Sequence, residues 1–523
     1  MAKEKSEGML SNDFFKDIYT QKNKVVWNEL PEYGRSAETV GEIIKNKAML
    51  DYNPALNTSS YVQVQFEPKE LEVIQNAIRI NLADQTIYPH AFNIHNEVVN
   101  MVARMWHCPE KDTDAGKASE SDWCNQHCSH AHTKQVDSEA LGVFNGAGTV
   151  GSTEGCLLAG IALKFRWRKW YAQKHHLSAE QVLAVRPNMV ISSCFQAAWE
   201  KFFRYFDVEP RIITPSVKTM TLDASMISDY VDDQTIGVVG ILGNHWAGQF
   251  DEIAAIDAAI EQINATKQFQ LGIHVDAASG GFIAPFIKSM DAWDFRLKNV
   301  LSISTSGHKY GEACAGTGWV IWRHRENLSE YVAVDVSYLG GHGDSYTLNF
   351  SRPSSGAFSQ YYKLLRFGRA GYQAACENAL ANAALLRAAL QEMTYASKPR
   401  FEILDSGEKH ALPVVAARLN PDCDFNYDDI DLQHALAVEH WYVSGYAMST
   451  IHPISEEVIP LFHDESMDAT MFRVVIKAHI TKPMINDLIA AFKSALEYLD
   501  SEVVNKDVRA LQRKRHRKIY KHC

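Results

Sequence analysis

The sequence lacks any apolar run long enough to cross a bilayer. The stretch TIGVVGILG (235–243) is among its longest apolar runs, whereas a membrane helix needs about 20 apolar residues. The first residues, MAKEKSEGMLSNDFF, carry charges and no apolar centre, so we expect no secretory signal. We therefore predict no association with membranes.

An excess of positive charge and a cysteine framework are also missing. The chain has 63 acidic and 52 basic residues, for a net charge of -11, which argues against nucleic acid as a partner. Nine cysteines, an odd number, are spread over 523 residues and do not resemble a disulfide framework. A reducing cytoplasm is the expected location.

Short, nearly continuous apolar runs alternate with longer helical patterns. Such runs are typical of buried parallel strands, and their alternation with helices predicts an α/β fold with a mostly parallel sheet. A chain of this length should also divide into domains. The expected strands are 188–193, 235–242, 271–278 and 300–304.

The expected division has three parts. Residues 1–56 are polar and form an N-terminal arm, with an amphipathic helix near 37–49. Residues 57–378 form the large domain, with an insert at about 107–135. Residues 379–523 form a smaller α+β domain that ends in a basic tail, 506–523.

Three polar signals stand where strands of the predicted sheet end, which is where open parallel sheets bind ligands. Asp276 follows LGIHV, Lys309 follows VLSISTSGH, and Ser152 and Thr153 lie in GTVGSTEG before a long helix. These are the groups that pyridoxal 5'-phosphate requires: a lysine for its aldehyde, a carboxylate for its ring nitrogen, and hydroxyls at a helix end for its phosphate.

Each signal has an ordinary structural explanation when taken alone. Asp276 is as readily a turn residue, Ser152 and Thr153 are more often helix caps, and a lysine such as Lys309 is more often on the surface. The three together, in this order and at strand ends, favour the cofactor.

The segments HVDAASGGFIAPF, SISTSGHKYG, YLGGHGDSYTLNFSRP and GTVGSTEGCLLAG resemble those of PLP-dependent group II amino acid decarboxylases, and most closely the glutamate decarboxylases. The resemblance runs from about Asn57 into the small domain. It implies a type I (aspartate aminotransferase-like) fold, α-decarboxylation of L-glutamate to γ-aminobutyrate, and a homodimer or larger dimer-based assembly with shared active sites.

The resemblance also assigns roles to single residues. Lys309 would bind the cofactor in Schiff-base linkage, Asp276 its ring nitrogen, and Arg473, in MFRVVIK, the substrate's α-carboxylate. Without the resemblance, a surface ion pair would be the better account of Arg473. The remaining cofactor contacts implied are Gln196 and Ala278 on the ring faces, Ser152, Thr153, Ser306 and His308 at the phosphate, and Phe350 and Ser351 from a partner subunit.

The pocket for the distal carboxylate is expected to contain Ser60, Tyr61, Asn81 and Asp84. Asn81 and Asp84 are equally consistent with turn capping. His245 stands where the family usually has a threonine near cofactor and substrate. This bulkier residue leaves aspartate or cysteine sulfinate as alternative substrates, and a non-catalytic protein of the same fold as a further alternative.

Two regions depart from the resemblance. The insert carries Cys108, Cys124, Cys128, His127, His130 and His132, but their spacing matches no paired metal motif, so we expect no metal. The tail holds six Lys or Arg between Arg513 and Lys521 and is expected to be solvated. His522 raises the hypothesis of a pH-dependent plug of the active site.

Overall fold

The computed structural model describes residues 30–111, 143–328, 347–405 and 410–501, with the short pieces 332, 334–335 and 344–345. The chain divides into two compact units, 1–52 and 53–523. In the first, α2 (Ala37–Ala48) confirms the expected helix and begins after Ser36, whose hydroxyl accepts a hydrogen bond from the Thr39 N–H. That side-chain cap satisfies one of the free amides of the first turn.

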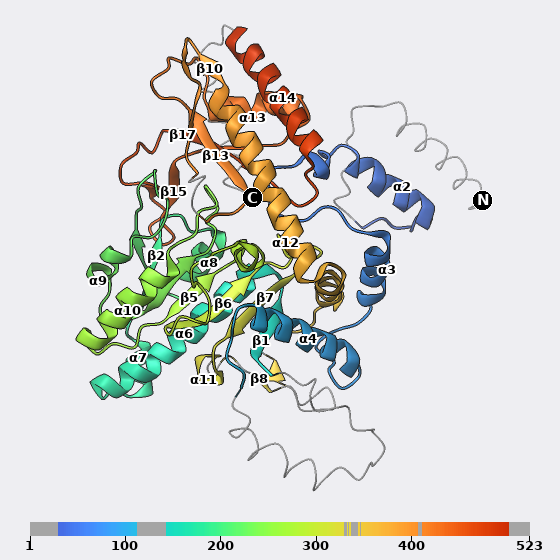
Figure 1. The fold of residues 1–523 in the computed structure, drawn as a ribbon. Coiled ribbons are helices and arrows are strands. Elements are labelled where there is room, and N and C mark those ends of the chain that lie inside the picture. Colours follow the sequence, from blue (N-terminus) through green and yellow to red (C-terminus); the bar gives the residue numbers. More distant parts are fainter. Residues whose placement is uncertain are drawn as a thin grey trace, which may run out of the picture. The chain divides into compact units, whose positions relative to one another are not determined.

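The second unit is built on a seven-stranded sheet with the order β1-β7-β6-β5-β4-β2-β3 (Figure 1). Only β7 runs antiparallel to its neighbours, so the other six strands share one direction. The strands are β1 (Asn145–Thr149), β2 (Asn188–Ser192), β3 (Glu209–Ile213), β4 (Thr235–Ile241), β5 (Ile273–Asp276), β6 (Val300–Thr305) and β7 (Gly318–Trp322). The four strands expected from apolar runs are confirmed as β2, β4, β5 and β6.

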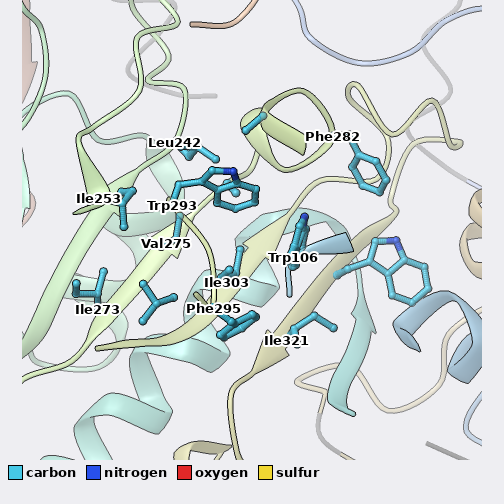
Figure 2. Close-up of a cluster of buried hydrophobic side chains, with 14 of the residues drawn as sticks. Trp106, Leu242, Ile253, Ile273, Val275, Phe282, Trp293, Phe295, Ile303 and Ile321 are labelled. Carbon is cyan, nitrogen blue, oxygen red and sulfur yellow. The ribbon is translucent and has the colours of Figure 1, made fainter. Parts of the chain in front are cut away.

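Helices cover both faces of this sheet, which is why its strands are apolar on both sides. Successive residues of β4 show it: Val238 joins a cluster with α10, while Val239 joins one with α6 and α8. Figure 2 shows the first cluster, in which Trp106 and Trp293 pack near Ile303. The covering helices are α4 (Pro89–Met105), α6 (Gly151–His175), α8 (Ala197–Tyr205) and α10 (Ile253–Lys267).

A second, antiparallel sheet follows in the C-terminal part, with the order β12-β13-β17-β14. Its strands pack with α13 (Asp429–Val438), α14 (Lys482–Ser501) and the long α12 (Ser355–Glu392). The strands are β12 (Phe401–Ile403), β13 (Val414–Leu419), β14 (Ser444–Ala447) and β17 (Thr470–Val475). Across the described ranges, no helix is both long and apolar enough to span a membrane.

Helix α12 passes from the large sheet towards the small one and contains the expected domain boundary at 378/379. It kinks at Gly368, whose φ of 56° is a left-handed conformation that glycine adopts at little cost. Because the helix is continuous through residue 378, we retain the boundaries at 56/57 and 378/379 as a proposal about folding units only.

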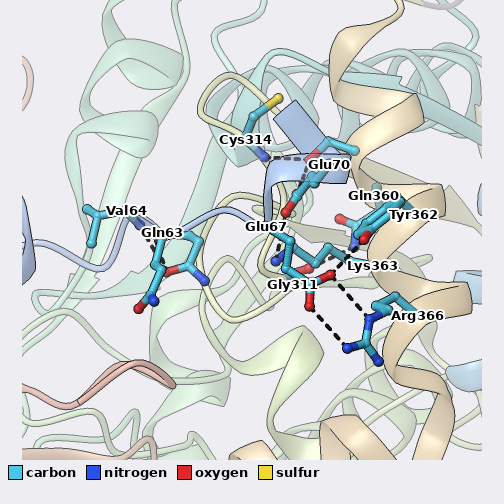
Figure 3. A network of polar contacts seen from close by, with 12 residues as sticks. Gln63, Val64, Glu67, Glu70, Gly311, Cys314, Gln360, Tyr362, Lys363 and Arg366 are labelled. Atoms are coloured by element: carbon cyan, nitrogen blue, oxygen red, sulfur yellow. Dashed lines mark hydrogen bonds and ion pairs between the residues drawn. The ribbon is translucent and has the colours of Figure 1, made fainter. Parts of the chain in front are cut away.

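A buried polar network fixes the loop that follows β6 (Figure 3). Lys363 of α12 forms an ion pair of 3.0 Å with Glu70 of α3 (Pro68–Ala77), and both side chains are almost fully buried. Ser359 donates to Glu70 and accepts from the Cys314 N–H, while Gln360 donates to the Gly311 carbonyl. A buried network of ion pairs and hydrogen bonds restrains its members, so these contacts hold the loop after β6 in place.

Candidate active site

Three chain segments meet at the carboxyl edge of the large sheet, because β1, β5 and β6 run in the same direction. Asp276 is the last residue of β5, Ser306 follows β6, and Ser152 lies in the first turn of α6, directly after β1. The Ser306 hydroxyl donates to the Ser152 hydroxyl at 2.8 Å and accepts from the Ser152 N–H at 3.2 Å. The predicted convergence of polar groups therefore exists.

The candidate phosphate cradle is formed by Ser152, Ser306 and His308 at the N-terminus of α6. Gly151 has a φ of 73°, and a side chain there would meet the His308 ring at 3.0 Å. His308 Nδ1 donates to the Thr317 carbonyl at 2.7 Å, and burial lowers the pKa of His308 to about 4. A phosphate beside Nε2 would favour the protonated ring, which can then donate to it. Thr153, the residue after Ser152, is half-buried.

Asp276 is buried and accepts three hydrogen bonds. Trp199 Nε1 donates to Oδ2 at 2.8 Å and Gln196 Nε2 at 3.2 Å, while the Ala278 N–H donates to Oδ1 at 3.0 Å. A carboxylate has about four acceptor sites, so one site remains for a ring N–H. A buried carboxylate oriented by three donors suits a protonated pyridine nitrogen.

Lys309, in the loop after β6, lies near Asp276 at the same edge of the large sheet. Its Nζ donates to the Ser279 hydroxyl at 3.1 Å and lies 5.3 Å from the centre of the Tyr61 ring. Burial lowers the pKa of Lys309 to about 8, although Asp276 opposes this effect. A larger share of the amine is therefore unprotonated near neutral pH, and that form attacks an aldehyde. Together with the cradle and Asp276, the donor set fits pyridoxal 5'-phosphate.

Arg473, on β17 of the small sheet, reaches the Tyr61 ring. It is 1% exposed, and its guanidinium carbon lies 5.0 Å from the centre of the Tyr61 ring. Nη2 donates to the Ser59 carbonyl at 2.7 Å and Nη1 donates to the His245 carbonyl. The Nε atom is buried without a hydrogen-bond partner. A guanidinium fixed in this way suits a carboxylate.

An extended segment, residues 57–63, ties the two sheets together and carries two predicted pocket residues. Thr58 donates its N–H to Tyr442 and accepts from the Val475 N–H, while the Gln63 N–H donates to the His308 carbonyl. Tyr61 is thereby held between Arg473 and Lys309. The Ser60 hydroxyl accepts from the Val62 N–H. We call residues 57–63 the linking segment.

His245 lies beside Tyr61 and Arg473. Its carbonyl accepts from Arg473 and makes a longer contact of 3.5 Å with the Tyr61 hydroxyl. Its ring centre lies 5.8 Å from that of Tyr61 and 6.3 Å from that of Trp246. Although the side chain is exposed, partial desolvation and the nearby cations Arg473 and Lys309 lower the pKa of His245.

The other predicted pocket residues form a separate group. The Asn81 Oδ1 accepts from the Arg352 N–H at 3.1 Å, and Nδ2 lies 3.4 Å from the Ser351 hydroxyl. Asp84 accepts at its backbone from the Ile87 and Tyr88 N–H groups before α4. The structure thus brings Asn81 together with Ser351, and Phe350 precedes it. The amide of Asn81 is engaged here rather than at Lys309 or Arg473.

Some contributors were missed by the sequence analysis. Trp199 is three residues after Gln196, and that helical spacing places both on one side of α8, which was the available signal. Ser279 and Ser59 act through contacts that depend on tertiary structure.

Most Cys and His residues of the insert, and the tail with His522, lie outside the described residues. In the described part, no group of His, Cys, Asp or Glu could hold a metal ion.

Comparisons with known proteins agree with this geometry. The glutamate decarboxylase of Lactococcus lactis subsp. lactis is 33% identical over 493 residues, covering 93% of this chain and 94% of that protein. The glutamate decarboxylase beta of Listeria monocytogenes is 33% identical over 501 residues, covering 92% and 96%. The solved glutamate decarboxylase of Lactobacillus brevis superposes with a TM-score of 0.78 at 33% identity, covering 93% and 98%.

These similarities confirm the expected resemblance and the expected α/β fold. Residues 65–420 match the pyridoxal-dependent decarboxylase conserved domain. That match confirms the cofactor, pyridoxal 5'-phosphate, and the reaction class, a carboxy-lyase acting on an amino acid. The chain belongs to the pyridoxal-dependent decarboxylase family.

Proposed function

We propose that this protein decarboxylates L-glutamate at its α-carbon, giving γ-aminobutyrate and carbon dioxide. The observation that carries the proposal is the proximity of Lys309 to both Asp276 and Arg473, with Tyr61 lying between Lys309 and Arg473. The names and high coverage of the relatives support glutamate as the substrate.

Each residue has a separate task. When bound, pyridoxal 5'-phosphate supplies the electron-poor ring that accepts the electron pair left by departing carbon dioxide. Lys309 binds the aldehyde, and Asp276 retains its charge against the ring nitrogen. Arg473 binds the α-carboxylate and orients the bond to be broken, while Tyr61 lies between Lys309 and Arg473 and excludes water.

His245 favours a second candidate, a shorter acidic substrate such as aspartate or cysteine sulfinate. Its carbonyl accepts from Arg473 and its ring centre lies 5.8 Å from that of Tyr61, so an imidazole here leaves less room beside the α-carboxylate than a threonine would. One methylene more or less in such a pocket changes kcat/KM by about 10- to 200-fold.

The test is carbon dioxide release from the purified protein with pyridoxal 5'-phosphate, using L-glutamate, L-aspartate and L-cysteine sulfinate at acidic and neutral pH. We expect kcat/KM for glutamate to exceed that for either alternative by about tenfold or more. His245→Thr serves as the matched variant, and a changed substrate ratio would identify His245 as a determinant. Turnover of aspartate alone would show that aspartate, and not glutamate, is the substrate. No turnover of any of the three acids would indicate a non-catalytic protein.

We also propose a homodimer in which the Asn81–Ser351 group completes the partner's active site. The segments 78–88 and 347–354 are joined by the Leu82 N–H to Arg352 carbonyl bond and the Asn81 contacts. These segments carry three exposed apolar side chains, Ile78, Ile87 and Leu348, which are 49–65% exposed. Exposed apolar side chains on two joined segments are consistent with a protein interface.

Mixing two inactive variants tests this arrangement. The Lys309→Ala variant lacks the cofactor lysine but keeps Asn81. The Asn81→Ala variant lacks Asn81 but keeps Lys309. If the sites are shared, each mixed dimer regains one complete site, so refolding the two variants together should restore about a quarter of wild-type activity. Activity no higher than the sum of the separate variants would show that Asn81 serves its own subunit.

A cytoplasmic location is proposed on the cysteines. All six described ones are free thiols: Cys108, Cys156, Cys194, Cys314, Cys376 and Cys423. Thiols persist in reducing compartments.

A further inference from the structure

The charge on Asp276 depends on few groups. His274, two residues before Asp276 on β5, is hydrogen-bonded to the hydroxyls of Ser302 and Ser304 at 2.8 and 3.1 Å. Burial lowers the pKa of His274 to about 4, so its ring is neutral, and burial raises the pKa of the Cys156 thiol well above its usual value. Neither provides a positive charge, and Lys309 is the nearby cation. Lys309 is assigned to the cofactor's aldehyde, so the three N–H donors are the groups that hold the carboxylate in place.

Trp199 is the fixed side-chain donor among them. It is fully buried, its ring lies 5.7 Å from Phe202 in an edge-on contact, and it lies 5.5 Å from His274. An indole packed in this way cannot turn its nitrogen to another acceptor. Gln196 is half-buried at the start of α8, and its flexible amide is expected at a ring face. Trp199 is then the side chain whose bond to Asp276 persists.

We propose that Trp199 is a positioning residue that fixes the orientation of the Asp276 carboxylate and leaves one Oδ1 acceptor site directed at the cofactor's ring nitrogen. The inference rests on the proposed role of Asp276 and is independent of which amino acid is the substrate. Without the indole N–H, the carboxylate loses a charge-assisted hydrogen bond to Oδ2 and is free to rotate. Its remaining acceptor site is then poorly aligned with the ring nitrogen, which weakens cofactor binding.

The experiment is Trp199→Phe, with Trp167→Phe as the matched control. Trp167 is also buried, and its Nε1 donates to the Asp233 carbonyl at 2.8 Å, remote from the cofactor. Titration of each apoprotein with pyridoxal 5'-phosphate, followed by absorbance, gives a Kd. We expect Trp199→Phe to raise Kd by about 10- to 100-fold, the usual effect of a hydrogen bond to a charged group, and Trp167→Phe to change it by less than about threefold.

A double-mutant cycle separates positioning from packing. In an Asp276→Asn background, Trp199→Phe should have little further effect on Kd, since the carboxylate that it orients is gone. An equal loss in both backgrounds would overturn the proposal, as would an unchanged Kd in the single variant.

Should Trp199→Phe fail to fold, benzothienylalanine at position 199 keeps the ring size and lacks only the N–H, and the same Kd criterion applies. Normal cofactor binding by the wild type without glutamate turnover would refute the substrate and leave this inference intact.

Discussion

Replacing Lys309 with alanine is expected to lower kcat by about three orders of magnitude or more, because the amine that binds the aldehyde is lost. Lys309 is partly buried beside Asp276 and Ser279, and its lowered pKa of about 8 supplies free amine near neutral pH. The visible absorbance of the bound cofactor should disappear in the same variant. Carbon dioxide release and an absorbance spectrum of the dialysed protein measure both effects.

Lys477→Met is the matched control for this prediction. Lys477 is likewise buried, burial lowers its pKa to about 8, and its Nζ donates to the Val62 carbonyl at 3.3 Å. Loss of that amine should leave the absorbance band in place. If Lys309→Ala kept the band while Lys477→Met lost it, the assignment of the cofactor lysine would be wrong.

Replacing Arg473 with alanine is expected to raise KM by about a hundredfold, because a buried cation that pairs with the substrate's carboxylate is removed. The cofactor band should remain, since Lys309 and Asp276 are unchanged. Arg473→Lys keeps the charge but not the planar two-donor geometry and should recover only part of the loss. Steady-state kinetics and a cofactor spectrum separate the two effects.

Arg418→Ala distinguishes substrate binding from general stability. Arg418 lies on the neighbouring strand β13 and is largely buried in ion pairs with Glu402 and Glu465. Its loss should lower the free energy of unfolding, as Arg473→Ala also should, without raising KM. A similar rise of KM in both variants would mean that Arg473 supports the small sheet and does not bind substrate.

The sequence was informative where the local pattern determines structure. Runs such as 235–242 and 300–304 are apolar because both faces of the sheet are covered, and that property is visible without a structure. The same runs placed Asp276 and Lys309 at one edge, since parallel strands end together. The cofactor and family followed from these positions and from the resemblance.

The contacts that complete the site depend on the tertiary fold. Nothing near Asn81 in the sequence indicates that it meets Ser351, 270 residues away. Trp199 lies close to Gln196 in the sequence, but an indole is usually assigned to the core, and only the direction of α8 turns its nitrogen towards Asp276. The hydrogen bond from Arg473 to the His245 carbonyl likewise joins residues 228 positions apart.

The linking segment has a consequence for how the protein loses activity. It is bonded to the loop of Lys309 through Gln63 and to the strand of Arg473 through Thr58 and Ser59, so it acts as a spacer of fixed length between the two anchors of cofactor and substrate. Any opening that releases these few bonds disturbs both anchors in one event. The protein can therefore become inactive while both of its sheets remain folded.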